Sequence, residues 1–434
     1  MNKPINENYA AVVVKIIALV PLDGCDKVQA TIIMGNQVVV GLDVHMNEMG
    51  LYFPVETALS KEYLSANNLY KKAELNKDST KKGYFEENGR IKCVKFRGHK
   101  SEGLYMPLNS LEFITKGYAA ELPTIGGSFD EYQKVPICSK YVIKTNKIQG
   151  TPNSKKGKGK LARESKLIEN QFRFHDDTSI LYKNLHKIHP HDLISITYKM
   201  HGTSGISAKI LCKKPLNWFE KLASKFIKVV DTHYDYIYSS RKVIKNPDLN
   251  PNAVHFYDTD IWGKAHEMVK EFLSDGMTFY YEIVGFLPSG GYIQGPFDYG
   301  QEEGKFEIRI YRITYTNPSG KVFEFSAHQV QDFCKEKGLL AVPELYYGSV
   351  FDFMFRYAEL SVQNPENMED FLSVLKEMYN EKDCYICKNK VVEEGVVIRI
   401  EKNEFEAYKC KSFGFYEMES KNLDKNIIDI ESEN

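Results

Sequence analysis

The chain contains the stretch Tyr198-Lys199-Met200-His201-Gly202-Thr203-Ser204-Gly205, in which one lysine stands between an apolar run and a group of small residues. The run before it, residues 193–197, reads Leu-Ile-Ser-Ile-Thr, and β-branched residues of this kind predict a strand. Glycines and small residues after a strand let the backbone come close to a bound phosphate. A lysine amine held in a pocket at such a strand end is suited to act as a nucleophile.

Other charged residues follow this lysine on or beside strand-like runs. Arg241 comes after the Tyr-rich run 234–238, and Glu282 lies within the apolar run 279–285. Further along the chain come Tyr311 in the run 308–313, the pair Glu394-Gly395 at the start of an apolar run, and the alternating pair Lys409 and Lys411. Taken singly, each has an ordinary interpretation as a turn, a core residue or a solvent-facing strand edge.

Two common devices for binding nucleotide phosphates are missing. The sequence has no GxxxxGK[ST] loop, and the basic run near Lys155 does not have that spacing. A GxGxxG turn after a predicted strand is also missing. A nucleotide that binds to this chain therefore needs a different set of phosphate ligands.

The ordered set of segments resembles the covalent nucleotidyltransferase superfamily of polynucleotide ligases and RNA-capping enzymes. Lys199-x-x-Gly202 resembles the first motif of that superfamily, Glu282 the third, Glu394-Gly395 the fourth, and Lys409-x-Lys411 the fifth. A single KxxG means little, and it is the order of the segments on strand-like runs that carries the resemblance.

The subtype is suggested by the residue that follows the lysine by two places. DNA ligases and capping enzymes usually have aspartate there, whereas this chain has His201. The pattern KxHGT resembles RNA ligases of the second type, and a β-rich segment ahead of the catalytic domain resembles the Deinococcus-type RNA ligases. The segments 172–178 and 389–391 are similar to that group as well. Ser204 stands where second-type ligases often have asparagine.

The resemblance implies a role for each motif residue. Lys199 would attack the α-phosphate of ATP, and cations near it would lower the pKa of its amine from the ordinary value of about 10.4. Lys409 and Lys411 would neutralise charge on the α-phosphate, and Glu394 would hold Mg²⁺, directly or through water, with Mn²⁺ as a possible substitute. The implied nucleotide contacts also include Gly202, Arg241 to phosphate, Glu282 to a ribose hydroxyl, and Tyr311 stacked on adenine. His201 and His175 are interpreted as structural residues.

The predicted fold class is α+β, with two domains and a linker. Short strands around the hairpin signal Gly35-Asn36 predict an OB-like β-barrel in residues 1–140. Residues 141–166 are polar and basic, and they predict a flexible linker. Residues 167–434 are predicted to be the adenylyltransferase domain, built on antiparallel sheets with flanking helices.

Several elements of the second domain can be placed from periodicity. Trp218, Leu222 and Phe226 recur at helical spacing, which predicts an amphipathic helix packed on the core, and a second helix is predicted over 261–273. The runs 278–284, 306–314, 392–400 and 406–411 predict strands.

The N-terminal strand that begins at Arg90 is basic. Arg90, Lys92, Lys95 and Arg97 either track an RNA backbone or form a solvated edge strand whose lysines block aggregation, and the sequence leaves both alternatives open. The net charge of the chain is −1, so RNA binding needs such local patches.

Composition and sequence patterns limit the cellular compartment that is expected and the chemistry that is expected of the cysteines. The N-terminus has no signal-peptide pattern and no apolar run is long enough to span a membrane, so a cytoplasmic protein without a membrane partner is expected. The eight cysteines are scattered, which fits a reducing compartment. Cys384 and Cys387 form a CxxC pair without a second pair at zinc spacing, so an ordinary turn is favoured over a metal site.

The function expected from the sequence is ATP-dependent RNA ligation. Ends bearing a 3′-hydroxyl and a 5′-phosphate, at nicks or breaks in RNA-containing duplexes, would be joined through a lysyl-AMP intermediate and an RNA-adenylate. One alternative is a GTP-dependent capping guanylyltransferase, although that family usually has its OB domain after the catalytic domain. A second alternative is a non-catalytic RNA-binding protein with a degenerate nucleotide pocket.

Overall fold

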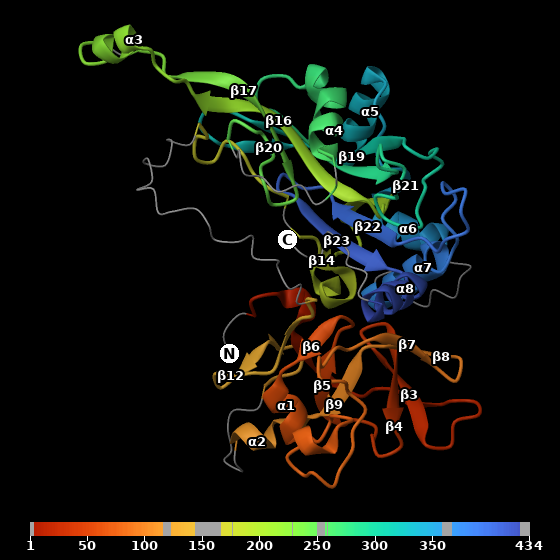
Figure 1. The fold of residues 1–434 in the computed structure, drawn as a ribbon. Helices are drawn as coiled ribbons and strands as arrows, with labels where there is room; N and C mark the ends of the chain where they lie inside the picture. Colours follow the sequence, from red (N-terminus) through yellow and green to blue (C-terminus); the bar gives the residue numbers. More distant parts are fainter. Residues whose placement is uncertain are drawn as a thin grey trace.

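The computed structural model describes residues 4–115, 123–143, 166–175, 177–227, 229–249, 257, 259–357 and 367–425. We refer to residues 4–143 as the N-terminal part and to residues 166–425 as the C-terminal part. The two parts lie one below the other in Figure 1, with the N-terminal part in red and orange. The predicted linker 141–166 falls almost entirely outside the described residues, and the predicted domain boundaries stay predictions.

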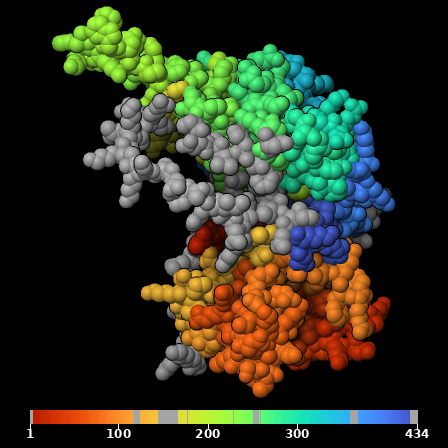
Figure 2. Space-filling model, in the orientation of Figure 1, coloured from red at the N-terminus to blue at the C-terminus, as the bar shows by residue number. Residues whose placement is uncertain are grey.

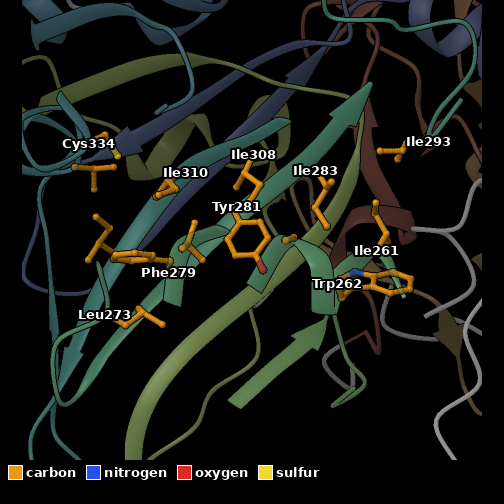
Figure 3. Close-up of a cluster of buried hydrophobic side chains, with 14 of the residues drawn as sticks. Ile261, Trp262, Leu273, Phe279, Tyr281, Ile283, Ile293, Ile308, Ile310 and Cys334 are labelled. Carbon is orange, nitrogen blue, oxygen red and sulfur yellow. The ribbon is translucent and has the colours of Figure 1, made fainter. Parts of the chain in front are cut away.

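The C-terminal part contains one long antiparallel sheet in the order β17-β16-β18-β19-β20. Helix α4 (Ile261–Val269) and helix α5 (Ala327–Lys337) pack on one face of it through a buried apolar cluster (Figure 3), in which Trp262 lies beside Ile261, and Phe279 and Tyr281 come from β18. The strands are β16 (Thr203–Lys213), β17 (Thr232–Ser240), β18 (Met277–Gly285), β19 (Phe306–Thr316) and β20 (Val322–Glu324).

A second sheet of the C-terminal part has the order β14-β23-β22-β15-β21. Its apolar face, with Ile196 and Ile398, packs on α6 (Val350–Arg356) and α7 (Met368–Tyr379). The strands are β14 (Ser179–Ile180), β15 (Leu193–Tyr198), β21 (Glu344–Ser349), β22 (Gly395–Ile400) and β23 (Glu406–Lys411), and α8 (Phe413–Asp424) follows β23 directly.

The two sheets turn their other faces toward one hollow. Because side chains alternate along a strand, Ser195 and Thr197 of β15 point away from the cluster that holds Ile196. The same alternation sends Val397 and Arg399 of β22 into the hollow. Each sheet is thus apolar toward its helices and mixed in polarity toward the space between the sheets.

The N-terminal part is a set of short antiparallel sheets with small helices. One sheet has the order β10-β1-β5-β9, a second the order β2-β3-β4, and β6–β13, β7–β8 and β11–β12 form pairs. The elements are β1 (Ala11–Lys15), β2 (Val20–Pro21), β3 (Val28–Ile33), β4 (Asn36–Gly41), β5 (Met49–Phe53), β6 (Thr57–Leu59), α1 (Lys61–Ala66), β7 (Cys93–Phe96), β8 (His99–Glu102), β9 (Leu104–Pro107), α2 (Glu112–Thr115), β10 (Ser128–Phe129), β11 (Glu131–Tyr132), β12 (Val135–Pro136) and β13 (Cys138–Lys140). The predicted hairpin at residues 35–36 is confirmed, since Ile33 pairs with Asn36. Among the described strands no closed ring forms, so the OB-like barrel stays a prediction.

The basic strand of the N-terminal part lies against α8. Its β7 is shorter than the predicted run, and the buried Arg90 ahead of it donates a hydrogen bond to the carbonyl oxygen of Ser420 at 3.0 Å and pairs with Asp424. Lys92 Nζ lies 2.8 Å from an oxygen of Asp424, and Lys95 Nζ lies 3.6 Å from Glu417. Arg97 donates to the carbonyl oxygen of Gly24 at 2.6 Å. Arg90, Lys92 and Lys95 therefore join the two parts, and RNA contact by these four residues stays a prediction.

One element is placed differently from its prediction. Helix α3 (Trp218–Ala223) forms at the start of the predicted segment and ends before Phe226, and Asn217 and Glu220 make a capping box at its start. The prediction that it packs on the core is wrong, because Trp218, Leu222 and Phe226 are all exposed. Helical spacing shows which side chains share a face, but it does not show what covers that face.

Candidate active site

Lys199 follows β15 directly and lines the hollow between the two sheets. Its backbone N–H donates to the carbonyl oxygen of Gly395 at 2.9 Å, which continues the pairing of β15 with β22 past the strand end. The phenol of Tyr198 donates to the carboxylate of Glu393, so the residues just before Lys199 and Glu394 are joined as well. Backbone pairing thus fixes Lys199 and Glu394 beside each other.

The lysine amine is part of a buried charge cluster. Lys199 Nζ lies 2.7 Å from Glu394 Oε1, and Lys411 Nζ lies 3.5 Å from the same oxygen. Burial alone would raise the pKa of Glu394, but the cations Lys199 and Lys411 outweigh burial and lower it. Lys411 also lies 2.8 Å from Glu419 on α8. The sequence predicts Lys199, Glu394 and Lys411 as site residues. Glu419 belongs to no predicted motif, and it lies beside Lys411 only because α8 folds back over β23.

The two strand lysines differ in their charge. Burial acts to lower the pKa of Lys411, but Glu419 and Glu394 raise it well above its ordinary value. Burial lowers the pKa of Lys409 to about 7, and repulsion from Lys411 and Lys199 acts in the same direction. Lys411 is therefore a fixed cation, while Lys409 changes its protonation near neutral pH.

Two glycines of the motifs are required by close packing. A Cβ atom on Gly202 would lie 2.5 Å from the carbonyl oxygen of Ile283 and 3.2 Å from a carboxylate oxygen of Glu282. Gly395 has a φ of +134°, and a Cβ atom there would lie 2.1 Å from the carbonyl oxygen of Cys410. These glycines let the strands that carry Glu282 and Lys411 approach the lysine.

Glu282 lines the same hollow as Lys199. Its Oε1 accepts a hydrogen bond of 2.7 Å from the hydroxyl of Ser204, which β16 places opposite Glu282 in the register of the sheet. Ser204 thus has a carboxylate partner in the position where second-type RNA ligases often have an amide.

One wall of the hollow is aromatic. Tyr311 contacts His175 edge-on with ring centroids 5.1 Å apart, and Phe405 also contacts His175 edge-on, at 5.5 Å. Burial, together with the cation Arg312, lowers the pKa of His175 to about 3, so its imidazole is neutral at ordinary pH. The sequence predicts Tyr311 at this site, whereas the positions of His175 and Phe405 beside it follow from the fold.

Arg241 lies at the base of the β16–β17 hairpin and lines the same hollow. It pairs with Asp177, a residue without a predicted role. The hollow therefore brings together Lys199, Arg241, Glu282 and Tyr311, with Glu394, Lys409 and Lys411 of the second sheet beside the amine.

The fit of a divalent cation depends on Glu394. Both of its oxygens are buried, and Oε2 has no hydrogen-bond partner in the described ranges, although His201 Nδ1 lies 3.8 Å from it. The described residues contain no group of three or more His, Cys, Asp or Glu that could hold a metal ion. A single carboxylate suits Mg²⁺ or Mn²⁺, which complete their coordination with water and substrate phosphates.

The cysteine pair lies beside the site without further metal ligands in the described part of the chain. A hydrogen bond from Cys387 is the largest of the effects that lower the pKa of Cys384 to about 7. The preference for an ordinary turn over a metal site at this pair therefore stays a prediction.

Among the described residues, none of the helices has the length and apolar character that a membrane-spanning helix needs.

Comparisons with known proteins bear on the fold. No protein-family model matches the chain, and no curated protein matches it. Among solved structures, a mutant RNA ligase of Naegleria gruberi with ATP and Mn is 14% identical, with a TM-score of 0.55, and the match covers 96% of this chain and 100% of that one. A complex of the same organism's RNA ligase with AMP and Mn is 14% identical (TM-score 0.53, 94% and 98% covered), and one with PPi is 13% identical (TM-score 0.54, 96% and 100% covered). The chain thus has an RNA ligase fold along nearly its whole length.

Proposed function

We propose that this protein is an ATP-dependent RNA ligase that acts through a lysyl-AMP intermediate. The observation that carries the proposal is the convergence of Lys199, Glu394 and Lys411 within hydrogen-bond or ion-pair distance, beside the hollow that Lys199 lines. The first and last of these residues lie 212 positions apart in the sequence. The RNA ligases of similar fold, with ATP, AMP or PPi in their structures, add support to this assignment.

In the first step, the unprotonated amine of Lys199 attacks the α-phosphorus of ATP. A phosphorus–nitrogen bond forms, the nitrogen loses a proton to solvent, the bond from that phosphorus to the bridging oxygen breaks, and pyrophosphate leaves. Glu394, 2.7 Å from the amine, orients it, and Lys411 places a fixed positive charge beside the phosphate. A divalent cation held by Glu394 would supply further charge neutralisation at the phosphates.

The hollow offers a fitting contact for each portion of AMP. Tyr311 and Phe405 supply aromatic surface for the base, and such stacking contributes about 1 to 3 kcal/mol per base. Glu282 is positioned to accept from a ribose hydroxyl, and Arg241 to bind phosphate through its planar guanidinium. ATP is favoured over GTP because an RNA ligase of similar fold has been solved with ATP.

In the second and third steps the adenylate moves to RNA. A 5′-phosphate oxygen attacks the phosphorus of lysyl-AMP, the phosphorus–nitrogen bond breaks, and Lys199 regains its amine. A 3′-hydroxyl then attacks the 5′-phosphorus of the RNA-adenylate, and AMP leaves. The Deinococcus-type subtype, with an OB-like N-terminal domain of residues 1–140 and duplex nicks as substrate, belongs to this proposal.

A second hollow provides a place for the RNA ends. It lies where the two parts meet, lined by Lys140 and Tyr141 of the N-terminal part and by His201, Gln294 and Glu419 of the C-terminal part. His201 contacts Glu394 from this side, and Lys199 contacts Glu394 from the other. The N-terminal part would therefore act on the steps that involve RNA, and only weakly on the loading of AMP.

The test of the proposed function is label transfer. The protein is incubated with α-labelled ATP or GTP and Mg²⁺, denatured, and examined for label that stays on the chain. Label from ATP, followed by its transfer to 5′-phosphorylated RNA, supports a ligase. Label from GTP supports the capping enzyme, and no label supports a binding protein. Nicks with RNA or DNA on each side of the break then define which strand must be RNA.

The pKa of Lys409 predicts a proton uptake on ATP binding. At about pH 8 this lysine is mostly neutral in the free protein, because its pKa is about 7, and the triphosphate favours its charged form. ATP affinity should then fall as pH rises above 7, by up to about tenfold per pH unit. Calorimetry in buffers of different ionisation enthalpy measures the uptake, which Lys409→Met should remove. An ATP affinity independent of pH between 7 and 9 contradicts the prediction.

The contacts between the two parts predict that one substitution can impair nick sealing without impairing self-adenylylation. Arg90→Ala removes a buried guanidinium that joins β7 to Ser420 and Asp424, and it should loosen the junction by about 1 to 3 kcal/mol. We expect nick sealing to fall at least about tenfold while self-adenylylation stays near the wild-type rate. Lys61→Ala, at an exposed position on α1 of the same part, is the matched control. Equal losses in both reactions would show that Arg90 supports the catalytic part as a whole.

A further inference from the structure

The hairpin of β16 and β17 ends in a projecting segment, residues 213–231, which we call the α3 arm. Leu167 pairs with Cys212 just before it, and the backbone N–H of Lys214 donates to the carbonyl oxygen of Asp231 across its base. Beyond that point the arm extends from the rest of the protein (Figure 1), and the space-filling view shows it as a separate lobe (Figure 2).

The arm exposes large apolar side chains. Trp218 is 65% exposed, Phe219 63% and Phe226 83%, and the exposed aliphatic residues of the arm are Leu222, Ile227 and Val230. The rings of Trp218 and Phe219 lie against each other, with centroids 3.5 Å apart. Soluble proteins rarely gather this much apolar surface on a projection without a partner for it.

The same arm is basic. Residues 213–231 contain five lysines, one glutamate and one aspartate, and the glutamate, Glu220, is paired with Lys214. Lys213, Lys221 and Lys225 are exposed beside the apolar side chains. Lysines around tryptophan, phenylalanine and leucine on a short amphipathic helix are typical of segments that lie in the interface of a membrane.

We propose that the α3 arm binds the surface of an anionic phospholipid bilayer. Its lysines would contact lipid phosphates, and its apolar side chains would enter the boundary between head groups and acyl chains. A single-stranded RNA fits the lysines and the aromatic rings, but it would leave Leu222, Ile227 and Val230 exposed to water. A bilayer covers aromatic and aliphatic side chains alike, so charge and apolar composition together favour the lipid surface.

The position of the arm leaves the proposed active site accessible. Strand β16 begins at Thr203, next to the lysine motif, and reaches the arm after 11 residues, which span about 35 Å. β17 returns from the arm to Ser240, just before Arg241. The sequence-based expectation of no membrane partner considers only spanning segments, and an interfacial helix needs none.

A vesicle-binding assay tests this proposal independently of the proposed ligase activity. The full chain is mixed with phosphatidylcholine vesicles and with phosphatidylcholine–phosphatidylserine vesicles, and binding is measured by flotation. We expect binding to the anionic vesicles, weaker binding to the neutral ones, and weakening by salt. The chain has two tryptophans, and Trp262 is 2% exposed, so a blue shift of tryptophan fluorescence on binding reports Trp218. Trp218→Phe should remove the shift and keep the binding.

Paired substitutions separate the contribution of the lysines from that of the apolar side chains. Lys221→Gln with Lys225→Gln should weaken binding to anionic vesicles by about 30-fold, at about fivefold per lysine. Leu222→Ser with Phe226→Ser should weaken it at least about tenfold. Phe355, which is 71% exposed on α6, provides the control Phe355→Ser, and this change should leave binding unaltered. Each variant is checked for an unchanged thermal unfolding midpoint.

Three results would overturn the proposal. The first is no binding to either kind of vesicle. The second is vesicle binding that the paired substitutions leave unchanged. The third is a loss of RNA binding or of self-association in the arm variants while the wild-type protein does not bind vesicles, which would assign the arm to RNA or to a second copy of the chain.

Discussion

Replacement of Lys199 by alanine is expected to abolish label transfer from ATP to the protein. The amine is the group that would form the bond to phosphorus, and Glu394 and Lys411 hold charge around it without offering a nucleophile in its place. Loss of a covalent nucleophile typically costs on the order of 10⁴-fold or more in rate. Formation of lysyl-AMP, measured as label retained after denaturation, should therefore fall below detection.

The same variant should keep part of the sealing pathway. RNA that already carries a 5′-adenylate needs no amine, so Lys199→Ala should still join it to a 3′-hydroxyl at a measurable rate. Lys209→Ala is the control, because Lys209 lies on the neighbouring strand β16 and pairs with Asp275. Wild-type labelling of Lys199→Ala would show that another residue accepts the adenylate.

Gly395→Ala is expected to be the most damaging change of a single methyl group. The left-handed φ of +134° is unfavourable for alanine, and the new Cβ would lie 2.1 Å from a backbone oxygen of β23, which cannot rotate away. β22 and β23 would have to separate where Lys411 pairs with Gly395, and the hydrogen bond from Lys199 N–H to Gly395 would be disturbed. We expect a loss of about 3 to 5 kcal/mol in stability and no detectable adenylylation.

Gly338→Ala is the matched control for this substitution. Gly338 caps α5 with a φ of +67°, and a Cβ atom there meets nothing within 4 Å. It should cost only about 1 kcal/mol, the strain of the backbone angle alone. Thermal unfolding and ATP labelling are measured on both variants. If the two variants behaved alike, the close contact of β22 with β23 would not be what requires glycine at residue 395.

Much of the C-terminal fold follows from local sequence. β23 spans Glu406–Lys411 as predicted, and β15 ends at Tyr198, directly before the lysine, because its β-branched run stops there. Alternation along β23 puts Lys409 and Lys411 on one face, and the fold turns that face toward Lys199. The joint order of the motifs, rather than any single one, allowed these residues to be named in advance.

Contacts between distant segments could not be predicted. Arg90 and Asp424 are 334 residues apart, so the sequence leaves an RNA-binding face and a solvated edge strand as equal alternatives, and neither of them includes the junction with α8. Glu419 reaches Lys411 only because α8 turns back along the sheet. The exposure of α3 likewise depends on which elements meet, and that information is not local.

Peptide mapping by mass spectrometry after incubation with ATP and Mg²⁺ tests the central claim most directly. The proposal predicts one AMP group on the peptide that contains Lys199, with the acid lability of a phosphorus–nitrogen bond, and its disappearance when pyrophosphate or 5′-phosphorylated RNA is added. An adduct on any other residue, or no adduct under conditions in which the protein still joins RNA ends, would contradict it.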